Sequence, residues 1–155
     1  MNFFKNALIY RLSRDITIVE EQTIADLADK LEPFRFSPCG SQDMAKSGWV
    51  SPLGQYSDQL FHFVSGQLLL VIRREEKIIP RPTITDELNK KISKLESEQA
   101  RCLKKTEKDA LRDEVLHSLL PRAFSRNIIT RIWVNTTDHM VIVDASSARS
   151  AEDAL

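Results

Sequence analysis

The sequence predicts an α+β fold in which antiparallel strands and hairpins flank a long inserted helical hairpin. Three observations support it. The 155 residues are 42% hydrophobic and 28% charged, which is typical of a globular domain. Two pairs of strand-like segments each meet at a short turn, near Ser65-Gly66 and near Thr137-Asp138. Between those pairs, residues 83–120 carry apolar side chains at helical spacing.

The first half of the chain supplies most of the predicted sheet. Residues 3–12 are rich in aromatic and branched side chains and predict a strand, and residues 20–31 predict a helix that ends before Pro33. Residues 37–54 hold three of the four glycines, which predicts a loop with a short strand around Trp49. Residues 60–64 and 67–79 then predict a hairpin that turns at Ser65-Gly66.

The second half begins with the helical hairpin. Thr83 and Asp86 have the spacing of a capping box, so we expect a helix from Thr83 to about Lys105. Thr106 would then cap a second helix that ends at Leu120, before a proline. Residues 127–134 and 140–144 predict another hairpin, and a final helix is expected to begin near Ser147 and to be cut at Leu155, as in a fragment of a longer protein. We therefore predict a sheet domain over 1–79 and 122–155 and a helical hairpin subdomain over 80–121.

The charges cancel over the whole chain but not along it. The 22 basic and 22 acidic residues give a net charge of zero, which excludes a strongly basic tail. Residues 73–131, however, hold 15 basic and 10 acidic residues, a net charge of +5 between two acidic flanks. Because the local field governs binding to a polyanion, this block is the predicted nucleic-acid surface.

A helical wheel drawn from Ile84 gathers much of this charge on one face. The apolar residues Ile84, Leu88, Ile92, Leu95, Cys102 and Leu103 fall in one arc, and a basic stripe lies opposite. The stripe consists of Lys90, Lys94, Arg101, Lys105 and Lys108, with Lys91 and Lys104 beside it. Such a row can follow a phosphate backbone, although a solvated amphipathic face explains the same pattern. Lys108 belongs to the stripe only if the helix continues through Thr106.

A second basic cluster follows the helices. Arg122, Arg126 and Arg131 lie within ten residues that hold no acid, and they are candidate phosphate ligands. Phe124 lies between the first two. An aromatic side chain there could stack on a base or anchor a protein contact, or it could be a core residue that fixes the chain after Pro121.

The sequence contains no signature of catalysis. Nucleotide-phosphate loops are absent, and Asp113 and His117 share a helical face without a further metal ligand nearby. The two cysteines are 63 positions apart, and no apolar run reaches the length of a membrane span. We therefore predict no catalytic residue, no metal, no cofactor and a cytoplasmic location.

Several long sequence words resemble the bacterial recombination-associated protein RdgC family. They are Phe4-Lys5-Asn6, Tyr10-Arg11-Leu12-Ser13-Arg14, the segment 38–46 (PCGSQDMAK), Gly48-Trp49-Val50, the segment 104–109 (KKTEKD) and the segment 114–126 (EVLHSLLPRAFSR). The resemblance covers essentially the whole chain. Family members are roughly twice this length, so the chain resembles their N-terminal half.

The resemblance implies an α+β protein that forms a ring-shaped homodimer around duplex DNA without sequence preference. Such proteins associate with the nucleoid, restrain RecA-promoted strand exchange and are not enzymes. Competition with RecA for DNA is our hypothesis for this restraint, and direct contact with RecA is the alternative. In such a ring Phe124 would be the subunit contact. The alternative is a dimerisation module whose DNA contacts lie mainly in the other half of the family chain.

Overall fold

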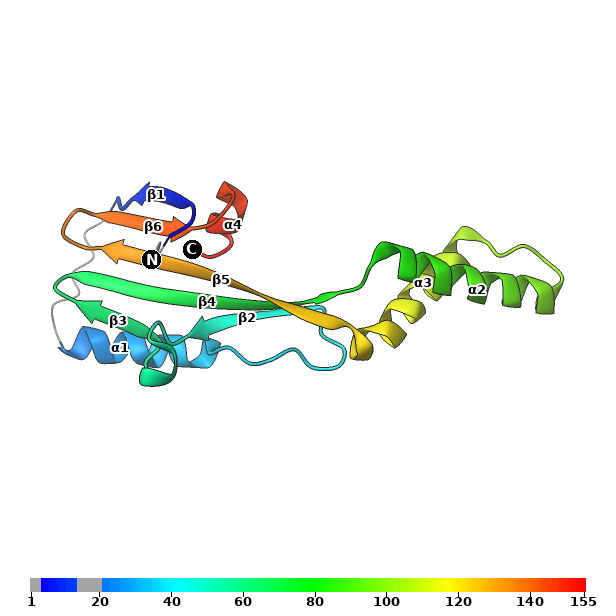
Figure 1. Ribbon diagram of the computed structural model, residues 1–155, viewed down its shortest axis with the longest axis horizontal. Helices are drawn as coiled ribbons and strands as arrows, with labels where there is room; N and C mark the ends of the chain where they lie inside the picture. The colour runs from blue at the N-terminus through cyan, green and yellow to red at the C-terminus, as the bar shows by residue number, and fades with distance from the viewer. Residues whose placement is uncertain (1–3, 14–20) are drawn as a thin grey trace. The chain divides into compact units, whose positions relative to one another are not determined.

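A computed structural model describes residues 4–13 and 21–155 of the chain (Figure 1). Its strands are β1 (Ala7–Arg11), β2 (Ala45–Val50), β3 (Phe61–Val64), β4 (Gln67–Ile78), β5 (Phe124–Asn135) and β6 (Met140–Asp144). Its α-helices are α1 (Glu21–Leu31), α2 (Arg81–Gln99), α3 (Lys105–Leu119) and α4 (Ala148–Glu152). The predicted starts of the first strand at Phe3 and of the first helix at Glu20 lie outside the described residues.

The described strands form one antiparallel sheet, which confirms the α+β prediction. The strand order is β1-β6-β5-β4-β2, and β3 pairs with β4 beside this path. Residues Ala7 to Arg11 of β1 pair with Asp144 to Met140 of β6, and β5 pairs antiparallel with β6. The helices α2 and α3 are inserted between β4 and β5 in the chain, as predicted.

The chain divides into two compact units. The sheet unit comprises Met1–Ser37, Lys46–Arg74 and Asn127–Leu155. The hairpin unit comprises Pro38–Ala45 and Glu75–Arg126, so it contains α2, α3 and the ends of β4 and β5. The sequence divided the chain at 79/80 and 121/122, whereas the units divide at 74/75 and 126/127 and assign the loop 38–45 to the hairpin unit.

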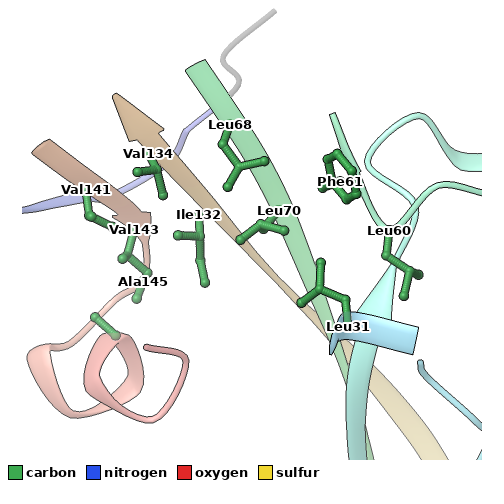
Figure 2. Close-up of a cluster of buried hydrophobic side chains, with 11 residues drawn as sticks. Leu31, Leu60, Phe61, Leu68, Leu70, Ile132, Val134, Val141, Val143 and Ala145 are labelled. Atoms are coloured by element: carbon green, nitrogen blue, oxygen red, sulfur yellow. The ribbon is translucent and has the colours of Figure 1, made fainter. Parts of the chain in front are cut away.

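The sheet unit has a continuous apolar core on one face of the sheet (Figure 2). Alternate residues of the strands point into it, because successive side chains of a strand face opposite sides. Helices α1 and α4 complete the same cluster through Leu31 and Ala151. The buried members are Leu31, Leu60, Phe61, Leu68, Leu70, Ile132, Val134, Val141, Val143, Ala145 and Ala151.

Two positions in the sheet unit depend on glycine. The β3–β4 turn has φ of 50° at Ser65 and 75° at Gly66, and Val64 pairs with Gln67 across it, which confirms the predicted two-residue hairpin. At Gly48 the segment after α1 approaches β2 closely, and Phe36 donates its N–H to the Trp49 carbonyl at 2.9 Å. A Cβ at Gly48 would lie 2.5 Å from the Phe36 Cα, so the sequence word Gly48-Trp49 has a packing reason.

The helix boundaries in the hairpin unit differ from the prediction. Helix α2 begins at Arg81 after Pro80, so the capping box at Thr83 was wrong. It ends at Gln99 rather than Lys105, because Ala100 adopts a left-handed conformation with φ of 49°. Helix α3 has Lys104 at its N-cap instead of the predicted Thr106, begins at Lys105 and ends at Leu119, one residue before the predicted end.

The end of the chain also differs from the prediction. The Ser147 hydroxyl accepts the Ser150 N–H at 3.2 Å, so Ser147 caps α4 as expected. Helix α4 nevertheless ends at Glu152, and the prediction of a helix still running at Leu155 was wrong. Across the described ranges, none of the helices combines the length and the apolar character needed to cross a membrane.

Candidate nucleic-acid interface

The turn between α2 and α3 is held by carboxylates at both of its ends. Glu96 of α2 accepts the backbone N–H of Leu103 at 2.8 Å. Glu107 of α3 accepts the backbone N–H of Lys104 at 2.7 Å, which satisfies a donor at the start of the helix. Leu103 is buried, with 8% of its surface exposed, and fixes the turn by packing. The predicted continuous basic stripe is therefore interrupted, and the wheel angles of residues 101–108 do not apply.

Arg101 is a structural partner of the same turn. Its guanidinium donates two hydrogen bonds to the Glu107 carboxylate, at 2.6 and 3.0 Å. The pKa of Glu107 is lowered from 4.5 to about 2. The Arg101 hydrogen bonds are the main cause, and the bond from the Lys104 N–H is the second. The same pairing raises the pKa of Arg101. A guanidinium engaged with a carboxylate in this way has fewer donors left for phosphate.

Five more of the predicted cations form ion pairs. Lys90 pairs with Glu87 within α2 at 2.9 Å, and Lys91 of α2 pairs with Glu114 of α3 at 2.6 Å. The Lys91 pair links α2 to α3. The others are Lys108 with Glu96 at 3.6 Å, Arg126 with Glu76, and Arg131 with Asp144 at 3.6 Å. Six of the ten predicted phosphate ligands are thus partly neutralised within the fold.

The remaining four predicted ligands carry a more available charge. Lys94, Lys105 and Arg122 are exposed and form no ion pair with any residue that the structure describes. Lys104 is exposed as well and acts on Glu107 only through its charge and its backbone. The structure therefore separates the ten predicted cations into six that form ion pairs within the fold and four whose charge is available to a ligand.

The sequence analysis passed over two further cations of this unit. Arg81 at the start of α2 and Arg112 on α3 are both exposed, and neither forms an ion pair within the described ranges. Arg112 lies seven residues after Lys105, so the two side chains share a face of α3. The spacing alone indicates this relation, but the predicted stripe ended at Lys108 and so left Arg112 out.

The net charge of the hairpin unit is smaller than that of the basic block in the sequence. The unit holds 12 basic and 11 acidic residues, a net charge of +1. Arg73, Arg74 and Arg131 belong to the sheet unit, and Asp43 joins the hairpin unit through the loop 38–45. The charge of +5 over 73–131 is therefore not a property of one folded unit, and local exposure decides which cations are available.

Phe124 is not a core residue. It is the first residue of β5 and 86% of its surface is exposed, which excludes the core alternative. Met44 and Ile78 of the same unit are also exposed, at 53% and 45%. The Lys77 N–H donates to the Met44 carbonyl at 2.8 Å, so the loop 38–45 lies beside the end of β4. The hairpin unit thus presents apolar side chains in addition to its cations.

The loop word PCGSQDMA is explained by its contacts within the hairpin unit. Cys39 donates its N–H to the Glu75 carboxylate at 3.0 Å, and the Gln42 amide oxygen lies 3.0 Å from the His117 Nδ1. His117 therefore meets Gln42 instead of forming a metal pair with Asp113, and no cluster of three metal-ligating side chains occurs in the ranges described. Cys102, which the helical wheel placed on the apolar side, is exposed in the turn after α2.

Comparison with known protein families matches nearly the whole chain to a single family. A family model described as "Putative exonuclease, RdgC" matches residues 2–155. The chain belongs to the RdgC family. The "Recombination-associated protein RdgC" of Yersinia enterocolitica serotype O:8 is 55% identical over all 155 residues, and the proteins of that name from Yersinia pestis and Yersinia pseudotuberculosis are equally similar.

The RdgC relatives are longer than this chain. The match covers 100% of the chain but 50% of each relative, so the chain spans about half the length of the curated relatives that it matches. The relatives are named for recombination, and the family description names an exonuclease. The two descriptions share a nucleic-acid context and differ on catalysis.

Proposed function

We propose that the chain is a sequence-nonspecific DNA-binding part of an RdgC protein. In the proposed assembly, a homodimer surrounds duplex DNA in the nucleoid and restrains recombination by competing with RecA for DNA. The observation that supports the DNA contact is the exposed set Lys94, Lys104, Lys105 and Arg122, whose side chains form no ion pair with any described residue while neighbouring cations are paired. Phosphate contacts of this kind position a protein without reading bases.

The salt dependence of duplex binding tests this proposal. If about four phosphates are neutralised, log K falls against log salt concentration with a slope of roughly −4. Fluorescence anisotropy with two unrelated duplexes of equal length measures both the slope and the sequence preference. A flat salt dependence, or a strong preference for one duplex, contradicts the proposal.

A charge-reversal set locates the DNA contact. The triple variant Lys94→Glu, Lys105→Glu and Arg122→Glu is expected to lose at least 100-fold in affinity. Arg101 is left intact, because its replacement would release Glu107 and disturb the turn. The matched control is Lys5→Glu, Lys30→Glu and Arg149→Glu, three exposed cations of the sheet unit that change the net charge equally. Equal losses in both variants would mean that net charge rather than this surface governs binding.

The proposal assigns no catalytic step to the chain, although the family description names an exonuclease. An end-labelled duplex incubated with the protein and Mg²⁺ or Mn²⁺ distinguishes the two. We expect the label to stay on full-length strands. Shortening that depends on the metal and on the protein would replace binding by hydrolysis as the function.

A second candidate function is dimerisation, with DNA contacts elsewhere in the family chain. Phe124 favours it, since a phenylalanine that is 86% exposed is well placed to anchor a contact between subunits. Sedimentation of the wild type and of Phe124→Ala tests it, with Tyr56→Ala as control because Tyr56 is equally exposed in the sheet unit. A dimer that binds no DNA favours this candidate, and a monomer that binds DNA defeats it.

A further inference from the structure

The sheet unit has a second apolar face, opposite its core. Because alternate side chains point to opposite sides of a strand, the neighbours of the core residues in β1, β6, β5, β4 and β3 all lie on this face. Five of them, one from each strand, are Ile9, Ile142, Trp133, Leu69 and His62, and we call this set the outer row. Polar residues of the same face, among them Arg131 and Asp144, lie toward the end of the β5–β6 pairing. A sheet face that is meant for water usually carries polar residues at these positions, whereas four of the five here are apolar.

The strand register places the outer row in two sets of directly paired residues, on the neighbouring strands β5 and β4 and beyond them. Ile9 of β1 pairs with Ile142 of β6, and Ile142 pairs with Trp133 of β5. On the other side of the sheet unit, Leu69 of β4 pairs with His62 of β3. Directly paired residues on one face are close enough for their side chains to contact each other.

A hollow of about 480 Å³ lies on the same face. It is lined by Phe4, His62, Val64, Ser65, Gln67, Leu69 and Trp133, all of the sheet unit. Neither α1 nor α4 contributes to it, because both helices pack on the core side. Phe4, His62, Leu69 and Trp133 are half-buried in this lining, whereas Val64 is 53% exposed, and Ile9 on the same face is 65% exposed. The face therefore combines protruding apolar side chains with a hollow.

We infer that this outer face is the docking surface for the other half of the RdgC chain, the half that these 155 residues do not match. Each relative compared with this chain carries such a half, of the same length as the matched one. Within one polypeptide its effective concentration reaches the millimolar range, so even a modest apolar interface stays closed. The docking element is expected to present an apolar face to the outer row, since four of the five residues of the row are apolar.

The test joins the two halves in trans. The 155-residue chain is co-expressed with the unmatched half of the Yersinia enterocolitica relative, and their complex is measured by co-purification and by titration of the separate proteins. In a Trp49→Phe background Trp133 is the sole tryptophan, and its emission is expected to shift to shorter wavelength on binding, because the hollow becomes dry.

Two exposed positions locate the interface. Ile9→Glu and Val64→Glu are each expected to weaken the complex at least tenfold, since a carboxylate would be buried without a partner. Leu53→Glu is the matched control, because Leu53 is an exposed apolar residue of the same unit that lies outside the hollow. Circular dichroism of each variant alone checks that the fold is kept.

Three results would overturn the inference. One is the absence of a complex when both halves are folded, and another is equal affinity of the Ile9, Val64 and Leu53 variants. The third is a homodimer of the 155-residue chain that Ile9→Glu dissociates, which would assign the face to a second copy instead. None of these results depends on DNA, so this inference can fail while the proposed function holds.

Discussion

The two units of the molecule are stabilised in different ways. The sheet unit buries eleven side chains in one cluster and draws them from four strands, two helices and two positions next to strands. Of the residues described in the hairpin unit, three apolar side chains are buried: Leu103, Val115 and Leu120. Its helices are instead tied by Arg101 to Glu107, by Lys91 to Glu114 and by the carboxylate of Glu96 on the turn.

This contrast explains why basic residues in a basic segment are not equivalent. Two helices cannot enclose a large apolar core. Ion pairs between charged side chains therefore also hold α2 and α3 together. Each exposed ion pair contributes only about 0–1 kcal/mol, and several are needed. Cations that are paired in this way are less available to a polyanionic ligand. The unpaired cations define the surface that such a ligand would contact.

The largest expected effect is a cavity in the sheet core. Ile132 is 2% exposed at the centre of the cluster, and Ile132→Ala is expected to lower the free energy of unfolding by about 3 kcal/mol. Urea denaturation followed by circular dichroism measures it. A loss below about 1 kcal/mol would show that the sheet unit does not depend on this core.

A smaller loss is expected where two backbones meet in the sheet unit. Gly48→Ala would place a Cβ within 2.5 Å of the Phe36 backbone and cost about 2 kcal/mol, because the segment after α1 has to move. Ser47→Ala, at the neighbouring exposed position of β2, is the control and should leave the urea midpoint unchanged. Equal midpoints for the two variants would mean that the close approach is not maintained in solution.

Lys105 and Lys108 of α3 allow an unpaired and a paired lysine to be compared in DNA binding. Lys105→Ala should reduce the magnitude of the salt slope by about 1 and weaken binding a few-fold, since one phosphate contact is lost. Lys108→Ala, whose ammonium is already paired with Glu96, should leave the slope nearly unchanged. If Lys108→Ala changes the slope and Lys105→Ala does not, ion pairing within the fold does not decide which lysines contact DNA.

The smallest expected effect concerns the turn between the helices. The pKa of Glu107 lies near 2 instead of 4.5, so its ionised form stabilises the fold above pH 4.5, and this contribution is lost as the pH falls through about 2. Carboxyl carbon NMR of the wild type and of Arg101→Gln measures the shift. In the variant the midpoint should move up toward 4.5, and a wild-type midpoint already near 4.5 would exclude the Arg101 contact in solution.

Much of the fold could be read from local patterns. The Ser65-Gly66 turn and the branched residues on either side of it predict the β3–β4 hairpin, because a tight turn and strand alternation act over a few residues. The end of α2 could not be predicted in this way. Ala100 is a good helix former, and its left-handed conformation accompanies the Glu96–Leu103 hydrogen bond and the burial of Leu103, which form only when the two helices pack.

The candidate site shows the same limit. Lys94 and Lys91 are near-equivalent in the sequence, yet Lys91 meets Glu114, which lies 23 residues away on α3. Arg112 could have been found by continuing the helical wheel past Lys108, whereas the exposure of Phe124 could not, since a phenylalanine after a proline suits a core equally well.

The sequence by itself determined the α+β class, the two hairpins, the inserted helices and the membership of the RdgC family, because these depend on local periodicity and on the order of residues. Only the tertiary structure decided which cations are neutralised, where α2 stops, and that the sheet carries a second apolar face. Ion pairs and burial join residues that are distant along the chain, and their partners are fixed only when the chain has folded.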